Sequence, residues 1–306
     1  MSNSIALVTK FLPLLDEVYQ KTAKSAFLEA PSAMVQQTMD ANTVKVAKIA
    51  MDGLGDYSKE DGFPKGDVTL SWETHTFTND RGRTFSIDKM DNIEALSLVV
   101  ANTIGEFMRL KVIPEVDAYR FSKIASTADI EGTTGTLTDS TTKAAIVTAL
   151  KELENNQVDL SNLVLAMTPD TKYFLENNIQ RTVMNGENGY NQLIETFNTV
   201  PIITIPQGRF YDKIDLYDGT TSGQTAGGYV KHAKTSAEGD TAGVDINFIL
   251  MDKSAAFAVT KNAVTRVFSP EVNQSKDAWK LDYRFYHDLF VYDNKRSGIY
   301  VHKKSA

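Results

Sequence analysis

The chain of 306 residues contains no cysteine. This absence excludes disulfide bonds and thiolate-ligated metal sites, and it fits a reducing cytosol. The sequence also lacks an apolar run near the ~18 residues that a membrane-spanning helix needs. Its first residues show no basic segment ahead of the apolar ones, so we expect no signal peptide. We therefore expect neither a membrane partner nor covalent cross-links through sulfur.

An excess of basic residues is missing as well. The formal net charge is -7 and the isoelectric point is near 5.2. A protein that holds nucleic acid through its phosphates carries a basic excess, so the chain is not an ordinary nucleic-acid binder. Hydrophobic residues make up 42% and charged residues 23% of the chain, which is typical of a globular protein with a real core.

Sequence motifs of catalysis are also lacking. There is no GxSxG elbow and no GxxxxGK[ST] loop, and Gly53-Leu54-Gly55 lacks the third glycine of a dinucleotide site. The histidines are widely separated and none has a metal-ligand spacing; they are His75, His232, His287 and His302. We predict no catalytic residue, no metal site and no cofactor.

One series of aspartates has a spacing that resembles a calcium-binding loop. Asp212, Asp215 and Asp218 recur at every third position. Aromatic and aliphatic residues intervene, however, and no glutamate closes the series at the distance that a calcium loop requires. We interpret the series as part of a solvated loop.

The first third of the chain predicts an extended excursion. An amphipathic helix is expected over residues 5–19, and a strand with a bulge over Val44–Met51. After a turn-rich stretch, two strand-like runs, Val68–Thr78 and Arg83–Asp88, are joined by Asn79-Asp80-Arg81-Gly82 in a hairpin-like arrangement. A two-stranded ribbon is marginal alone, so we expect it to lie on another surface.

The remaining residues predict a long helix followed by an α/β region. The helix begins with a capping box at Asp91 and Glu94 and extends to Ser126, with Pro114 expected to kink or break it. A loop over 126–140 comes next, and 207–243 is a polar surface insertion partly ordered by aromatic residues. Further helices are expected over 141–155 and from Pro169 on, and strands over 163–167, 200–205, 246–251, 259–268, 279–292 and 299–302.

Four segments together resemble the major capsid proteins of tailed bacteriophages. RGRTFSIDKMDN (81–92) is similar to the end of the extended loop and the start of the spine helix in that family, and PEVNQSKDAWKLDYRFYHDLFVYDNKRSGIYVH (270–302) to its carboxy-terminal part. IPQGRFYDKIDLYDG (205–219) and VDINFILMDKSAAFAVTK (244–261) lie between them. The order and spacing of the four are more specific than any one of them.

The resemblance implies an α+β fold of the Hong Kong 97 type. It implies an N-terminal arm (1–42), a strand and extended hairpin loop (43–90), and a spine helix with the peripheral domain (91–139). An α/β axial domain (140–260) with the insertion 207–243, and peripheral-domain strands (261–306), would follow. The short arm implies either a separate scaffolding protein or an already mature chain.

In function, the resemblance implies a non-enzymatic coat protein that self-assembles, as hexamers and pentamers, into an icosahedral head around phage DNA. Scaffolding, portal and decoration proteins are the implied partners, with non-specific contact to packaged DNA. The implied location is the virion, assembled in the cytoplasm of the bacterial host. Two alternatives are an encapsulin-like nanocompartment shell protein and an α/β enzyme with an unrecognised site.

A subunit interface is expected on the extended hairpin. Trp72, Phe77 and Phe85 lie on an element with too little core of its own, so their rings are expected to be buried on a neighbour. Arg81 and Arg83 are expected either in salt bridges at the foot of the hairpin or in bidentate pairs with a neighbour's carboxylates.

Overall fold

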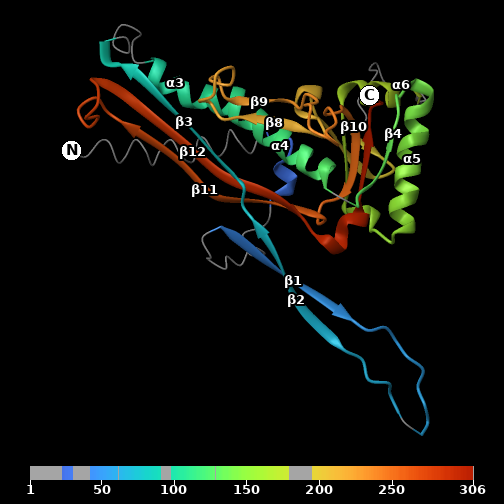
Figure 1. Cartoon of the computed structure of the whole chain (residues 1–306). Coiled ribbons are helices and arrows are strands. Elements are labelled where there is room, and N and C mark those ends of the chain that lie inside the picture. Colours follow the sequence, from blue (N-terminus) through green and yellow to red (C-terminus); the bar gives the residue numbers. More distant parts are fainter. Residues whose placement is uncertain are drawn as a thin grey trace, which may run out of the picture.

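The computed structural model describes residues 23–29, 42–60, 62–90, 98–127, 129–178 and 195–305. The helix expected over 5–19 and the capping box at Asp91 and Glu94 lie outside these residues. Figure 1 shows three parts: a long helix lying on a three-stranded sheet, a six-stranded sheet with helices, and a two-stranded ribbon that projects away from both. None of the helices in the described ranges combines the length and the apolarity needed to cross a membrane.

The six-stranded sheet has the order β4-β13-β10-β5-β7-β6. β10 pairs antiparallel with β5 and β13, whereas β5 with β7 and β13 with β4 are parallel. The strands β4 and β6 were not predicted. The other four were predicted from the sequence, and the structure confirms them. Their bounds are β4 Glu131–Thr134, β5 Leu163–Met167, β6 Thr196–Phe197, β7 Val200–Thr204, β10 Ile246–Asp252 and β13 Ile299–Lys303.

Helices cover both faces of this sheet. On one face α5 (Asp139–Asn155) and α6 (Pro169–Asn178) pack against Leu165 and its neighbours. On the other face α4 (Ile113–Ser126) packs against Ala166. Burial on both faces explains why β5 reads as an uninterrupted apolar run. α6 begins as predicted, because the hydroxyl of Thr168 accepts a hydrogen bond from the Thr171 N–H at 3.3 Å.

The long helix does not break at Pro114. It consists of α3 (Leu98–Phe107), a π-helical turn (Met108–Val112) and α4 (Ile113–Ser126). A π-helical turn shifts the hydrogen bonding by one residue, which accommodates a proline that has no N–H to donate. The helix lies on the three-stranded sheet, where its buried residues contact Leu281 and Phe285.

The three-stranded sheet corrects the predicted hairpin. It consists of β11 (Ala256–Phe268), β12 (Ala278–Val291) and β3 (Asn79–Asp88), and β3 pairs with β12 along its whole length. The turn predicted at 79–82 is therefore wrong, because these residues are the first of a strand. Gly82 is needed there for another reason: a Cβ atom on it would lie 2.9 Å from the carbonyl oxygen of Tyr283.

The ribbon is formed by β1 (Thr43–Met51) and β2 (Val68–Thr76), which pair antiparallel. Pairing is continuous from Thr43↔Thr76 to Met51↔Val68, so the predicted bulge is also wrong. The extended excursion therefore runs over 43–76 with its tip at 52–67, and β3 belongs to the body.

Two predicted domain limits change as well. Residue 260 falls inside β11, and β13 joins the six-stranded sheet rather than the strands of the other sheet. Part of the expected arm, residues 23–29, lies on the chain's own α4. There the carboxylate of Asp117 accepts hydrogen bonds from the backbone N–H and the hydroxyl of Ser25 at 3.0 and 2.7 Å.

Candidate assembly surfaces

One face of the ribbon is apolar and uncovered. Residues directly opposite in an antiparallel pair share a face, and Ile49↔Leu70 and Met51↔Val68 are such pairs, with Trp72 next along the same face. These five side chains, the apolar ribbon face, are 56–72% exposed. Contiguous apolar surface of this kind marks an interaction site on a soluble protein.

The base of the ribbon, by contrast, is anchored in the body. Val44 and Phe77 are buried in a cluster with Phe257 and Phe290, and the ring of His75 stacks on Phe290 at 4.8 Å. The base of the ribbon thus packs on the body, and the apolar ribbon face lies beyond this contact.

A buried carboxylate fixes the junction between ribbon and body. Asp288 of β12 accepts hydrogen bonds from the N–H and hydroxyl of Thr78 at 2.8 and 3.0 Å, from the Tyr119 hydroxyl at 2.8 Å and from the Lys123 ammonium at 2.5 Å. Burial opposes ionisation of Asp288, but the Lys123 hydrogen bond and charge outweigh it and hold its pKa below the ordinary value. The carboxylate therefore links β12 to α4 through Lys123, and to Thr78, which lies between β2 and β3.

The ribbon tip carries both rings and charge. Tyr57 and Phe63 are exposed, with ring centroids 4.9 Å apart. Asp52 closes the tip by accepting a hydrogen bond from the Asp67 N–H at 2.8 Å.

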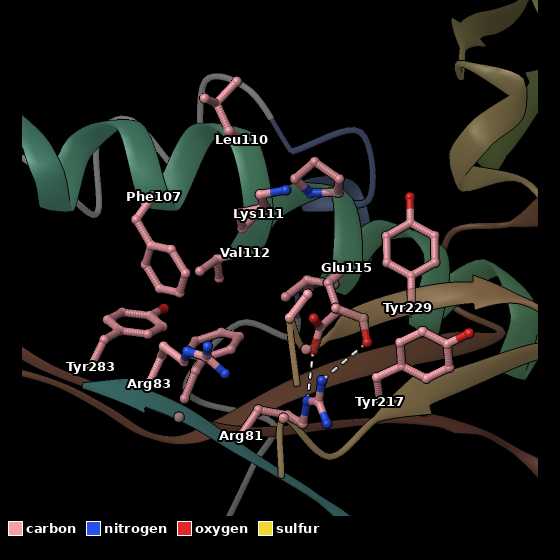
Figure 2. A pocket seen from close by; sticks show the side chains of 18 of the residues that line it. Arg81, Arg83, Phe107, Leu110, Lys111, Val112, Glu115, Tyr217, Tyr229 and Tyr283 are labelled. Carbon is pink, nitrogen blue, oxygen red and sulfur yellow. Dashed lines mark hydrogen bonds and ion pairs between the residues drawn. The ribbon is translucent and has the colours of Figure 1, made fainter. Parts of the chain in front are cut away.

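A cavity of about 920 Å³ lies where the long helix, β3, β12 and the insertion meet. The insertion contributes β8 (Ile214–Tyr217) and β9 (Gly228–Lys231). Figure 2 shows the rings of Phe107 and Tyr283, 5.7 Å apart, on one side and those of Tyr217 and Tyr229 on the other. Burial raises the pKa of Tyr229 to about 12, so its hydroxyl stays neutral at ordinary pH.

Two arginines lie at the floor of this pocket in Figure 2. Arg81 Nε lies 2.7 Å from Glu115 Oε1, and its Nη2 donates to the Gly228 carbonyl at 3.2 Å. Arg83 Nη2 donates to the Thr225 carbonyl at 3.1 Å. Each arginine therefore holds the insertion against β3.

The five residues predicted for the interface occupy three places. Trp72 belongs to the apolar ribbon face, Phe77 to the anchored base, and Arg81, Arg83 and Phe85 line the pocket. Sequence reasoning missed the remaining members of the apolar ribbon face, although the alternation from Val68 to Trp72 was its signal. Assigning β3 rather than β1 as the partner of β2 hid the pattern.

The acidic series of the insertion does not converge on one point. Asp212 is buried and accepts from the Val244 N–H, Asp215 contacts His232, and Asp218 accepts from two backbone N–H groups. Among the described residues no group of three or more His, Asp or Glu side chains is placed to hold a metal ion. The loop is thus held by internal hydrogen bonds.

His232 links β8 of this insertion, through Asp215, to the loop that contains Asp240. Its Nδ1 lies 2.7 Å from Asp215 Oδ1 and its Nε2 lies 3.0 Å from Asp240 Oδ1. These two hydrogen bonds, to Asp215 first and then to Asp240, raise the pKa of His232. Both ring nitrogens face carboxylates, so the geometry suits the doubly protonated, cationic ring.

No protein-family model and no curated protein matches the sequence. Solved structures do match in fold. A structure from Mycobacterium phage Che8 superposes with a TM-score of 0.59 at 12% identity, covering 92% of this chain and 90% of that one. The asymmetric unit of the bacteriophage PhiM1 mature capsid gives 0.55 at 12% identity, covering 89% and 84%.

A virus-like particle from Pyrococcus furiosus gives a TM-score of 0.54 at 12% identity, covering 94% of this chain and 95% of that one. The chain therefore has the mixed α and β fold of phage capsid proteins over nearly its whole length. The four sequence segments resemble proteins of the same kind.

Proposed function

We propose that the chain is the major coat subunit of a tailed-phage head, many copies of which close into an icosahedral shell around the genome. The observation that carries the proposal is the apolar ribbon face, which projects from a body with the fold of phage capsid proteins. A monomer gains nothing from such a face, whereas a shell subunit buries it on a neighbour.

The architecture supports a Hong Kong 97-type assignment of parts. The ribbon would be the extended loop, the long helix with the three-stranded sheet the peripheral domain, and the six-stranded sheet with α5 and α6 the axial domain. Hexamers and pentamers are the assembly units in this proposal. The role is structural, so the subunit needs no catalytic group.

The energetics favour many modest contacts. Full burial of one large apolar side chain contributes about 1.5–3 kcal/mol, and ordering at the interface offsets part of this gain. Each ribbon contact is therefore weak on its own, and the closed shell is stabilised by their number. The net charge of -7 limits attraction to packaged DNA to weak, non-specific contacts on the inner surface. Scaffolding, portal and decoration proteins belong to the same proposal, as does the virion as the location.

A nanocompartment shell is the second candidate, and the similarity to the Pyrococcus furiosus virus-like particle favours it. The two candidates differ in what the shell encloses. Particles purified from the natural source that contain phage DNA support the head, and particles that contain an enzyme support the nanocompartment.

Negative-stain microscopy with light scattering of the purified chain tests the shell proposal. We expect shells, tubes or capsomer rings. Leu70→Ser with Trp72→Ser should abolish them without unfolding the chain, whereas Thr69→Ala with Ser71→Ala, on the opposite ribbon face, should not. A wild-type chain that stays monomeric at high concentration, also with polyethylene glycol, contradicts the proposal.

A further inference from the structure

We propose that the cavity between the long helix, β12 and the β8–β9 insertion binds a nucleotide, a small anion in which an aromatic base carries a phosphate. We call this cavity the aromatic pocket; the residues used below are Arg83, Phe107, Lys111, Tyr217, Tyr229 and Tyr283. The inference goes beyond the proposed function and does not depend on it, because a single chain contains the whole pocket.

The pocket has two aromatic walls. On one wall the ring of Phe107 packs edge-to-face on Phe85 and Tyr283, with centroids 4.9 and 5.7 Å apart. On the other wall stand the rings of Tyr217 and Tyr229, one from each strand of the insertion (Figure 2). All five side chains are partly exposed, so each keeps surface that a ligand can cover. The bases of nucleotides stack on aromatic side chains of this kind.

The lining is positively charged although the chain is acidic. Four basic and three acidic side chains line the cavity, which gives a net charge of +1 there against -7 for the whole chain. Three ion pairs engage most of these groups: Arg81–Glu115, Asp80–Arg284 and Lys231–Asp245. Arg83 and Lys111 have no carboxylate partner among the described residues. The remaining carboxylate, Asp218, accepts hydrogen bonds from the Thr220 and Thr221 N–H groups at 2.9 Å. An anionic ligand therefore meets two cations whose charge no ion pair offsets.

A neutral hydroxyl group adds a hydrogen-bond donor to one wall. Burial raises the pKa of Tyr283 far above its ordinary value, so its hydroxyl stays protonated. Within the described ranges this hydroxyl has no hydrogen-bond partner, and Figure 2 shows its oxygen on the pocket side of the ring. The Tyr229 hydroxyl, by contrast, donates to the Gly208 carbonyl at 2.7 Å. Tyr283 can therefore donate to an acceptor on a ligand, such as a ring nitrogen of a base.

The size of the cavity suits a nucleotide. Its volume of about 920 Å³ lies within the ~300–1,000 Å³ typical of ligand pockets. Lys111 and Arg83 lie at different edges of the gap between the walls (Figure 2), so a phosphate at either edge meets a cation. No sequence motif indicates the site, because its residues come from four separate segments, 80–85, 107–116, 208–231 and 283–287.

Calorimetric titration of the unassembled chain with deoxyadenosine monophosphate tests the proposal. For a ligand of this size we expect a Kd on the order of 10–100 μM. Deoxyadenosine, which lacks the phosphate, and inorganic phosphate, which lacks the base, should each bind at least about tenfold more weakly. The other three deoxynucleoside monophosphates should bind within about threefold of the first, since stacking tolerates every base.

Matched variants assign the binding to this pocket. Tyr217→Ala removes a ring of one wall and should weaken binding of the nucleotide at least about fivefold, whereas Tyr217→Phe keeps the ring and should stay within about twofold. Lys111→Gln should weaken the nucleotide at least about threefold and leave deoxyadenosine unchanged. Lys143→Gln, at an exposed lysine of α5, is the control and should change neither. Circular dichroism establishes that each variant is folded.

Hydrogen exchange locates the ligand without any variant. Bound nucleotide should protect peptides that cover residues 107–112 and the β8–β9 insertion, and it should leave the ribbon unchanged. A single-stranded oligonucleotide that protects the same peptides more tightly identifies nucleic acid as the source of the nucleotide, and equal or weaker binding identifies the free nucleotide.

Three results overturn the proposal. They are no binding of any of the four nucleotides at about 1 mM, equal binding of nucleotide and deoxyadenosine, and wild-type affinity of a folded Tyr217→Ala chain. A chain that binds the nucleotide but forms no particles contradicts the proposed function alone, and a chain that forms particles but binds no nucleotide contradicts this inference alone.

Discussion

The carboxylate of Asp288 gives the sharpest prediction on stability. Asp288→Asn keeps the shape of the side chain but replaces one acceptor oxygen by a donating amide and removes the charge. The side chain is fully buried and currently accepts from Thr78, Tyr119 and Lys123. The amide cannot satisfy all of these donors, whichever way it is turned.

The expected cost follows from burial and geometry. Breaking a buried ion pair by neutralising one partner costs about 3–5 kcal/mol when both charges are buried. Lys123 is 33% exposed and regains water, which lowers the figure. We therefore expect a loss of about 2–4 kcal/mol in the free energy of unfolding.

Urea unfolding of the unassembled chain, checked by light scattering, measures this loss. Asp282→Asn is the matched control on the same strand, because its carboxylate is 29% exposed and should lose little. Hydrogen exchange adds a local readout, since the Thr78 amide donates to Asp288 and should exchange faster in the variant.

The pH dependence has a defined sign. The folded-state pKa of Asp288 is lowered, so its contribution is fully present above the unfolded pKa of about 3.9 and disappears as the pH falls through the folded value. The difference between wild type and variant should thus vanish in acid. A loss equal to that of the Asp282 control, or one unchanged in acid, refutes the assigned role.

Three further outcomes are expected. Leu165→Ala, in the fully covered strand β5, should cost about 2–5 kcal/mol in urea unfolding, whereas Leu54→Ala at the exposed tip should cost nothing measurable. Gly132→Ala places a Cβ against the backbone of β13 and should cost about 1–3 kcal/mol, unlike Gly53→Ala, whose Cβ meets open space. Because the pKa of His232 is raised, hydrogen-exchange protection of the insertion should be full below pH ~6.5 and decline as pH rises through the folded pKa, a decline that His232→Gln should lack.

Local patterns determined the elements that the sequence predicted correctly. The apolar run Leu163–Met167 followed by Thr168-Pro169 specifies a buried strand and a capped helix within a dozen residues. The helix over 139–155 likewise follows from its own spacing, with Ile146 and Leu153 fully buried. In these segments propensity, periodicity and capping agree, so neighbours along the chain suffice.

The pairing of strands that are far apart in the sequence could not be predicted in this way. Residues 79–82 have the composition of a turn, but the pairing of β3 with β12, some 200 residues away, holds them in a strand. The Asp288 carboxylate and the close approach of Tyr283 to Gly82 settle that choice. Both contacts join residues that are far apart in the sequence, so no local pattern indicates them. The pocket lined by β3 and the insertion could not be predicted for the same reason.

The alternation of Val68, Leu70 and Trp72 raises a different problem. Period-two apolar residues predict a strand with one buried face, yet that face is exposed in the single chain. The pattern and the structure agree only if the core that covers this face comes from another molecule. An exposed strand face with this alternation therefore predicts assembly, and its residues are those on which we expect assembly to depend.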